Sequence, residues 1–228
     1  MDTQRIEMLI GAEALNRLQK ARVAVLGLGG VGSYVAEALV RSGVGTVRII
    51  DKDVVDSSNA NRQLPALTST IGQSKVSVMA ARLRDINPQC HLETYEGLYE
   101  AGHFTECLPG EWDYIVDAID DLKAKIDLIG TCYGENIPLI SAMGTGNKLD
   151  PSLLKISDIS TTSVCPLARN VRRELRQRGI TKGVEVVFST ELPQKKSEGY
   201  TPASMVFVPA SAGLLMASWV VRKLISTK

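Results

Sequence analysis

The chain has 228 residues, of which 44% are hydrophobic and 22% charged, and its formal net charge is +1. This balance is ordinary for a globular protein and excludes one that binds polyanions through its charge as a whole. The N-terminal residues lack the basic, apolar and small-residue succession of a signal peptide. Four cysteines stand far apart, without any CxxC pair, at Cys90, Cys107, Cys132 and Cys165. We therefore expect a cytoplasmic protein with reduced thiols and no zinc site.

Short β-branched runs alternate with helical patterns along the first two thirds of the chain. Strands are predicted at 22–27, 46–51, 90–96, 112–120 and 137–144, with helices at 31–42, 73–87 and 122–135. Near-continuous apolar strands separated by helices indicate a Rossmann-like α/β fold. Its sheet is mostly parallel and carries helices on both faces. We assign 21–144 as a nucleotide-binding core.

The rhythm changes after residue 144, where a connection rich in Gly, Asn and Pro begins. Further strands are predicted near 153–157 and at 184–189, and a helix at 166–178. We interpret 145–228 as a C-terminal elaboration on the same sheet, so that 1–228 forms a single domain. The apolar stretch 204–221 predicts a short strand and then a buried helix; Pro209 and Gly213 interrupt it and argue against a membrane span. Peripheral membrane contact of that helix stays open.

A glycine motif, "GLGGVGS", separates the first predicted strand from the first predicted helix. Gly27, Gly29 and Gly32 satisfy G-x-G-x-x-G, and Gly30 adds a fourth glycine. Such a turn lets backbone N–H groups and a helix N-terminus approach phosphates. Asp51 ends the second strand, where a carboxylate can accept hydrogen bonds from ribose hydroxyls. The sequence therefore predicts a nucleotide site, without deciding between a dinucleotide and ATP.

A polar insertion after the second strand favours ATP. The residues that we expect beside its phosphates are Asn59, Asn61, Arg62, Gln63 and Lys75, and Asp53 is also expected to bind the cofactor. Cleavage between the α- and β-phosphates of ATP needs cations and hydrogen-bond donors around developing negative charge, and Arg62 and Lys75 meet that need. Asp117, Asp120 and Asp121 follow the fourth strand, at the sheet edge where ligands of open α/β sheets bind. A carboxylate there can hold Mg²⁺.

Together, the segments "GLGGVGS", "IID", "NANRQ", "GQSK" and "DAIDD" resemble the ThiF/MoeB/HesA superfamily, the relatives of ubiquitin-activating enzymes. The resemblance covers most of the chain. It implies a homodimer that adenylates a carboxylate with ATP and Mg²⁺. It also assigns phosphate contacts to Arg62 and Lys75, ribose to Asp51 and the metal to Asp120. Arg5 would be an arginine finger that reaches the neighbouring subunit's site.

The C-terminal third is similar to one branch of that superfamily. Sulfur-carrier activators commonly carry two CxxC pairs that bind zinc, which this chain lacks. The segments "SAMGTGNKLDP", "SVCPLA" and "VVFSTE" resemble instead the branch that dehydrates threonylcarbamoyladenosine in tRNA. That resemblance implies adenylation of the threonyl carboxylate, after which the substrate's own carbamoyl group displaces AMP. No protein nucleophile is needed, and we interpret Cys165 as a buried residue at a helix start.

A basic helix face fits a tRNA substrate. Four arginines recur at helical spacing, at Arg169, Arg172, Arg173 and Arg176, while Val171 and Leu175 mark the opposite, buried stripe. Guanidinium groups pair with phosphates and stack on unpaired bases. We expect this face, together with Lys195 and Lys196, to contact tRNA next to the anticodon.

Three other functions stay open from the sequence alone. An adenylyltransferase for a ubiquitin-like sulfur carrier is the nearest alternative. An NAD-dependent oxidoreductase would need only the glycine motif and would leave Lys75 and Asp120 unexplained. A nucleotide sensor without catalysis is the third. A monovalent cation near the nucleotide and a sulfur-transfer partner protein also stay open.

Overall fold

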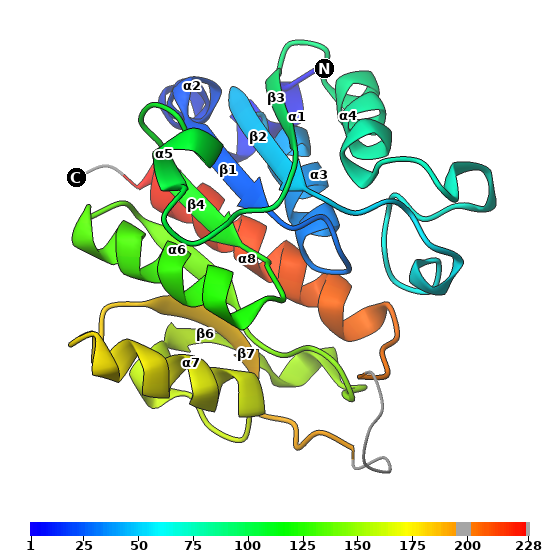
Figure 1. Ribbon diagram of the computed structural model, residues 1–228. Helices are drawn as coiled ribbons and strands as arrows, with labels where there is room; N and C mark the ends of the chain where they lie inside the picture. The colour runs from blue at the N-terminus through cyan, green and yellow to red at the C-terminus, as the bar shows by residue number, and fades with distance from the viewer. Residues whose placement is uncertain (195–201, 227–228) are drawn as a thin grey trace.

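The computed structural model describes residues 1–194 and 202–226, and in these residues one sheet of seven strands forms the centre of the molecule (Figure 1). The strand order is β3-β2-β1-β4-β5-β7-β6. The strands are β1 (Arg22–Leu26), β2 (Thr46–Asp51), β3 (His91–Glu96), β4 (Tyr114–Asp117), β5 (Leu139–Ala142), β6 (Leu154–Asp158) and β7 (Glu185–Ser189). Only β6 runs antiparallel to its neighbour. The predicted Rossmann-like, mostly parallel sheet is confirmed.

Helices cover both faces of this sheet. Their bounds are α1 (Gln4–Ile10), α2 (Ala12–Lys20), α3 (Gly32–Arg41), α4 (Lys75–Ile86), α5 (Phe104–Cys107), α6 (Leu122–Gly134), α7 (Pro166–Gln177) and α8 (Phe207–Ile225). Val23 and Val25 of β1 share a core with α3, α4 and α8, whereas Ala24 and Leu26 pack with α5 and α6. This alternation follows from the two-residue period of a strand. Helix α7 packs beside α6 and over β7.

The prediction of a short strand at the start of 204–221 is wrong. Residues 202–206 form no strand, and α8 begins at Phe207. Pro209 is the third residue of the helix, where its missing N–H costs nothing because the first four helical N–H groups have no partner within the helix. Gly213 is required by packing, since a Cβ there would lie 2.4 Å from the carbonyl oxygen of Val31 in the turn before α3. Helix α8 therefore approaches the glycine motif closely.

Helix α8 has the length and the mean hydropathy, 1.3, of a membrane-spanning segment. One face of this helix, however, packs against the rest of the protein. Ala212, Met216 and Val220 are fully buried in the core shared with α3 and β1. In Figure 1, α8 runs along one face of the sheet. Its contacts are those of a helix packed in the core of a protein.

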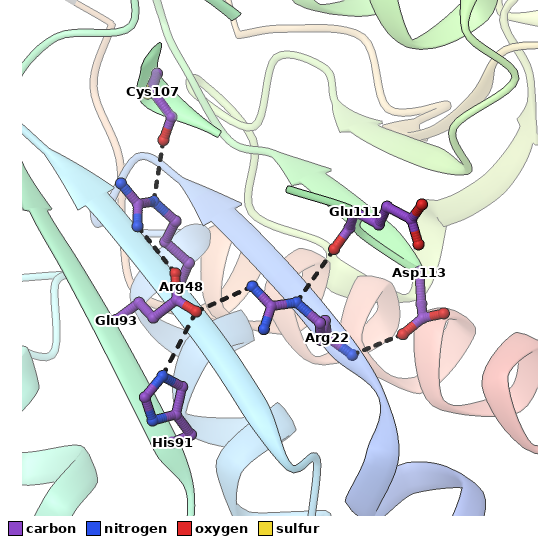
Figure 2. Close-up of polar contacts among 7 residues, drawn as sticks. All are labelled: Arg22, Arg48, His91, Glu93, Cys107, Glu111 and Asp113. Atoms are coloured by element: carbon purple, nitrogen blue, oxygen red, sulfur yellow. Dashed lines mark hydrogen bonds and ion pairs between the residues drawn. The ribbon is translucent and has the colours of Figure 1, made fainter. Parts of the chain in front are cut away.

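Polar side chains connect the three neighbouring strands β1, β2 and β3 (Figure 2). Glu93 on β3 accepts from Arg22 Nη2 at 3.0 Å and from Arg48 Nη1 at 2.9 Å. Arg22 also lies over the ring of Trp112, 4.7 Å from the ring centre. His91 pairs with the same carboxylate at 3.6 Å. Glu93 thus connects β3, the edge strand of the sheet, to the next two strands, β2 and β1.

A second polar cluster docks α8 on the amino ends of the strands. The Glu185 carboxylate accepts from the Tyr114 hydroxyl, from Trp219 Nε1 at 2.5 Å and from Lys223 Nζ at 2.9 Å. Burial works toward a higher pKa of Glu185, but these three hydrogen bonds outweigh it and lower the pKa below its usual value.

Glu185→Gln is expected to lower the free energy of unfolding by about 1 kcal/mol at neutral pH, because a neutral acceptor replaces a charged one. The pKa of the folded state is the lower one, so this contribution is complete above the unfolded pKa of about 4.3 and is lost as the pH falls through the folded pKa. Urea unfolding from about pH 7 down to about pH 2 should show the two proteins converging. A pH-independent difference would contradict the ion-pair assignment.

Candidate nucleotide site

A cavity of about 430 Å³ opens at the carboxyl ends of β1, β2, β4 and β5. Of the eleven residues that the sequence places at the nucleotide, Gly32 and Asn61 do not line it. The other nine do: Gly27, Gly29, Gly30, Asp51, Asp53, Asn59, Arg62, Gln63 and Lys75. Asp120 lines the same cavity. The residues come from four separate segments of the chain, which the parallel sheet brings to one edge.

The glycine motif forms a turn so tight that side chains are excluded at two positions. Gly27 has a φ of +90° and a Cβ on it would lie 2.6 Å from the carbonyl oxygen of Ala118. A Cβ on Gly32 would lie 1.8 Å from the Gly27 oxygen. Asp51 fixes the turn from β2, because its Oδ2 accepts from the Leu28 N–H at 2.6 Å. The turn leads into the ten-residue helix α3, whose N-terminus carries partial positive charge.

Lys75 is held at the cavity by its position at the start of α4. Its side chain is 6% exposed, and Nζ lies 2.9 Å from Asp53 Oδ2. Its backbone N–H donates to the carbonyl of Asp53 at 3.0 Å. Asp53 is half-exposed, so the ammonium group has one carboxylate partner and two further N–H donors for a ligand.

Arg62 and Gln63 follow the short turn Ser57–Asn59. Arg62 Nη1 donates to the Ser58 carbonyl at 2.9 Å and to Asn61 Oδ1 at 2.8 Å, which fixes one side of the guanidinium group. Gln63 is buried, and in the part of the chain that the structure describes its Oε1 has no hydrogen-bond partner. A buried acceptor without a partner is costly in free energy, so a donor from a ligand would satisfy it.

The three aspartates after β4 have three different environments. Asp117 is fully buried and accepts from Lys125 Nζ at 2.7 Å and from Ser141 Oγ at 2.6 Å. Asp121 caps α6 by accepting from the Ala124 N–H at 2.8 Å. Asp120 lies between them, exposed in the cavity, with no ion-pair partner among residues 1–194 and 202–226. The two flanking aspartates thus hold the loop that presents Asp120.

Lys125→Met is expected to lower the free energy of unfolding by about 3 kcal/mol, because it leaves the Asp117 charge buried without a partner. The double variant Asp117→Asn, Lys125→Met should be less destabilised than Lys125→Met alone, since it removes both buried charges. Urea unfolding of four proteins, the wild type, both single variants and the double variant, tests this pair. Strictly additive losses would show that the two side chains do not stabilise each other.

Other predicted residues lie outside the cavity. Arg5 is exposed on α1 and does not line it. Arg169, Arg173 and Arg176 are exposed on α7 and form what we call the α7 arginine face. Arg172 is turned inward, where Nη1 donates to the carbonyls of Ile159 at 3.3 Å and Thr162 at 3.0 Å. Lys195 and Lys196 lie outside the described residues.

Some cavity residues were not predicted. Gly144 and Thr145 follow β5, and Gly97, Leu98 and Tyr99 follow β3. The rule that ligands bind at the carboxyl ends of parallel strands could have indicated the residues after β5. The residue types at 97–99 do not indicate that this segment lines the cavity. Cys165 is 3% exposed and directly precedes α7, which agrees with its interpretation as a buried residue at a helix start.

The sheet, the glycine turn and the charged cavity define an α/β nucleotide-binding protein. The ThiF family model matches residues 2–228, and the chain belongs to the ThiF family. The chain is 46% identical to the tRNA threonylcarbamoyladenosine dehydratase of Bacillus subtilis in an alignment of 237 positions that covers 97% of this chain and 93% of that protein. The crystal structure of Escherichia coli tRNA N6-threonylcarbamoyladenosine dehydratase, TcdA, in complex with ATP matches with a TM-score of 0.91 and 33% identity, covering 97% of this chain and 92% of that one. A structure of the same enzyme with AMP also matches with a TM-score of 0.91.

Proposed function

We propose that this protein is an ATP-dependent enzyme that dehydrates N6-threonylcarbamoyladenosine in tRNA by adenylating the threonyl carboxylate. The observation that carries the proposal is the meeting of Arg62, Lys75 and Asp120 at one glycine turn, in a chain similar over almost its whole length to dehydratases. Cations beside a turn that approaches phosphate suit cleavage between the α- and β-phosphates. This function would place the protein with tRNA in the cytoplasm.

ATP fits the cavity by the chemistry of its walls. The turn from Gly27 to Gly32 and the N-terminus of α3 would receive the phosphates, with Lys75 and Arg62 as cationic partners. Asp51 ends β2 beside the turn, where its carboxylate would accept from the ribose. The unpartnered Gln63 Oε1 offers an acceptor for a further donor of the nucleotide. The ATP-bound and AMP-bound structural relatives support this assignment.

Asp120 would hold Mg²⁺ together with the phosphates. Among the described residues no group of three potential ligands surrounds a metal position. One carboxylate is nevertheless what Mg²⁺ commonly takes from a protein when substrate phosphates and water complete its octahedron. When bound, the ion neutralises charge on the leaving pyrophosphate. Asp117 and Asp121 are occupied by Lys125 and by the α6 cap, which leaves this role to Asp120.

The reaction balances without a protein nucleophile. A carboxylate oxygen of the threonyl group attacks the α-phosphorus of ATP, and pyrophosphate leaves. The carbamoyl group of the same nucleoside then attacks the activated carbonyl carbon, closes a ring, loses one proton to solvent and releases AMP with that oxygen. The nucleoside has lost one water. Arg62 and Lys75 stabilise the charge that develops on the phosphates in the first step, and the residues of the turn hold the nucleotide in line.

AMP release is expected only with tRNA that carries the threonylcarbamoyl group, and the modified nucleoside should become lighter by the mass of one water. Asp120→Asn should lower the rate of AMP formation by about a hundredfold, because it removes the charge that holds the metal. Mass spectrometry of the digested tRNA and chromatography of the nucleotides measure both. Pyrophosphate exchange with a Gly-Gly-ended carrier protein, and none with this tRNA, would favour the sulfur-carrier alternative.

A homodimer is part of the proposal. Helix α1 has no buried residue, and its Met8 and Leu9 are 81% and 84% exposed. Two adjacent apolar side chains that are this exposed to solvent favour contact with a second copy of the chain. Arg5 lies on the same short helix, outside the cavity of its own chain. These facts support its role as an arginine finger in the partner's site.

The α7 arginine face is proposed to contact tRNA. Val171 and Leu175 are fully buried, as the predicted stripe requires, so the helix presents Arg169, Arg173 and Arg176 outward. Arg173 shares its guanidinium group with Glu174 at 2.9 Å. Arg172 is left out of this surface because its guanidinium group is bound to the Ile159 and Thr162 carbonyls.

Replacing Arg169 and Arg176 by Glu should weaken tRNA binding by about tenfold or more near physiological salt, because phosphate contacts dominate such affinity. The matched control replaces the exposed Lys20 and Arg84 by Glu, which changes the net charge by the same amount away from α7. Filter binding with labelled tRNA and titration with ATP measure the two affinities. Equal tRNA affinity of both double variants would remove α7 from the interface.

A further inference from the structure

Two asparagines that do not line the nucleotide cavity connect two segments that do. One segment contributes Arg62 to the lining, and the other, after β5, contributes Gly144 and Thr145. The backbone of 202–204 is hydrogen-bonded to Asn61 beside the first segment and to Asn147 beside the second. We call this three-residue segment, Pro202–Ala203–Ser204, the strap.

Asn61 joins the strap to Arg62. Its Nδ2 donates to the Ser204 carbonyl at 2.8 Å, while its Oδ1 accepts from Arg62 Nη1 at 2.8 Å. Both ends of one amide are thereby used, so the orientation of Asn61 is fixed from two sides. The carbon chain of Arg62 also packs closely on the glycine turn, since a Cβ on Gly30 would lie 3.3 Å from Arg62 Cγ. A shift of the strap would therefore change the position of the Arg62 guanidinium group.

Asn147 joins the strap to the other wall. Its Oδ1 accepts from the Ala203 N–H at 2.9 Å, and its own N–H donates to the Ala203 carbonyl at 2.7 Å. Its φ is +58°, in the left-handed region that asparagine tolerates better than most residues. Gly146 lets the strap come near, because a Cβ there would lie 2.8 Å from the Cβ of Pro202. Thr145, two residues before Asn147, lines the cavity.

We propose that Asn61 and Asn147 are positioning residues, which act through the strap to hold Arg62 and the Gly144–Thr145 wall at a fixed separation during adenylation. The inference rests on the proposed function for the reaction whose rate it concerns. Neither asparagine lines the cavity, so each would act through its neighbours. A guanidinium group that must meet charge appearing only in the transition state depends on such support, because misplacement by about 1 Å is costly in rate.

The experiment uses substitutions that separate backbone geometry from hydrogen bonding. Asn147→Gly accepts the φ of +58° without strain and removes the acceptor for Ala203, whereas Asn147→Asp keeps an acceptor. Asn136→Gly is the matched control, because Asn136 has a φ of +56° and lies at the opposite end of the sheet. Asn61→Ala removes the other connection. The double variant Asn61→Ala, Asn147→Gly tests whether both act through one segment.

AMP formation with threonylcarbamoylated tRNA should fall by about tenfold in kcat for Asn147→Gly and Asn61→Ala, with the KM for ATP changed by less than about twofold. The double variant should be no more than about twofold slower than the slower single variant. Asn147→Asp and Asn136→Gly should retain the wild-type rate within about twofold. A multiplicative double effect, a change confined to the KM for ATP, or an equal loss in the Asn136→Gly control would overturn the proposal.

Hydrogen exchange gives a readout that does not depend on activity. The Ala203 amide should exchange at least about tenfold faster in Asn147→Gly than in the wild type, and its protection should return in Asn147→Asp. Unchanged protection would overturn the strap itself. A wild-type protein that protects this amide but forms no AMP with the modified tRNA would instead defeat the proposed function, so the two failures are distinguishable.

Discussion

Close backbone approach around the glycine motif joins the loop after β4 and the C-terminal helix to the turn that opens the cavity. Within the turn, Gly27 lies against the segment after β4, and Gly32 lies against the Gly27 carbonyl. Gly30 lies near the start of α8, where a Cβ on it would be 3.2 Å from the Cβ of Pro209. From the other side, Gly213 lets α8 pack on the carbonyl of Val31. The C-terminal helix therefore supports the glycine turn directly, which is consistent with one structural unit.

The charged groups after β4 differ in whether they pair within the protein or face the cavity. Asp117 and Lys125 neutralise each other in the core, and Asp121 is consumed by a helix cap, so the same short run of sequence leaves only Asp120 facing the cavity. Lys75 and Arg62 each have some hydrogen-bonding capacity committed to the protein and some left over. Groups held in this way need little reorganisation when charge develops on a bound nucleotide.

Much of this arrangement could be predicted from the sequence because it follows from strand order and chain direction. Parallel strands place Asp51 and Asp120 at one edge, and the apolar periodicity of 166–178 places Val171 and Leu175 inside. The inward turn of Arg172 could not be predicted, since it depends on carbonyls exposed by the turn at Ile159–Thr161. The start of α8 was also missed, because a proline in the first helical turn looks the same in sequence as one that ends a strand. The strap depends on distant backbone contacts, of which an isolated Asn gives no sign.

The proposed reaction requires that the threonyl carboxylate of the substrate becomes an acyl adenylate. The most direct test uses tRNA whose threonyl carboxylate carries ¹⁸O in both oxygens, incubated with the enzyme, ATP and Mg²⁺. Attack by that carboxylate on the α-phosphorus, followed by ring closure, leaves one ¹⁸O in each AMP, which mass spectrometry detects. AMP without the label in the presence of dehydrated product, or label recovered in inorganic phosphate alongside ADP, would contradict the account.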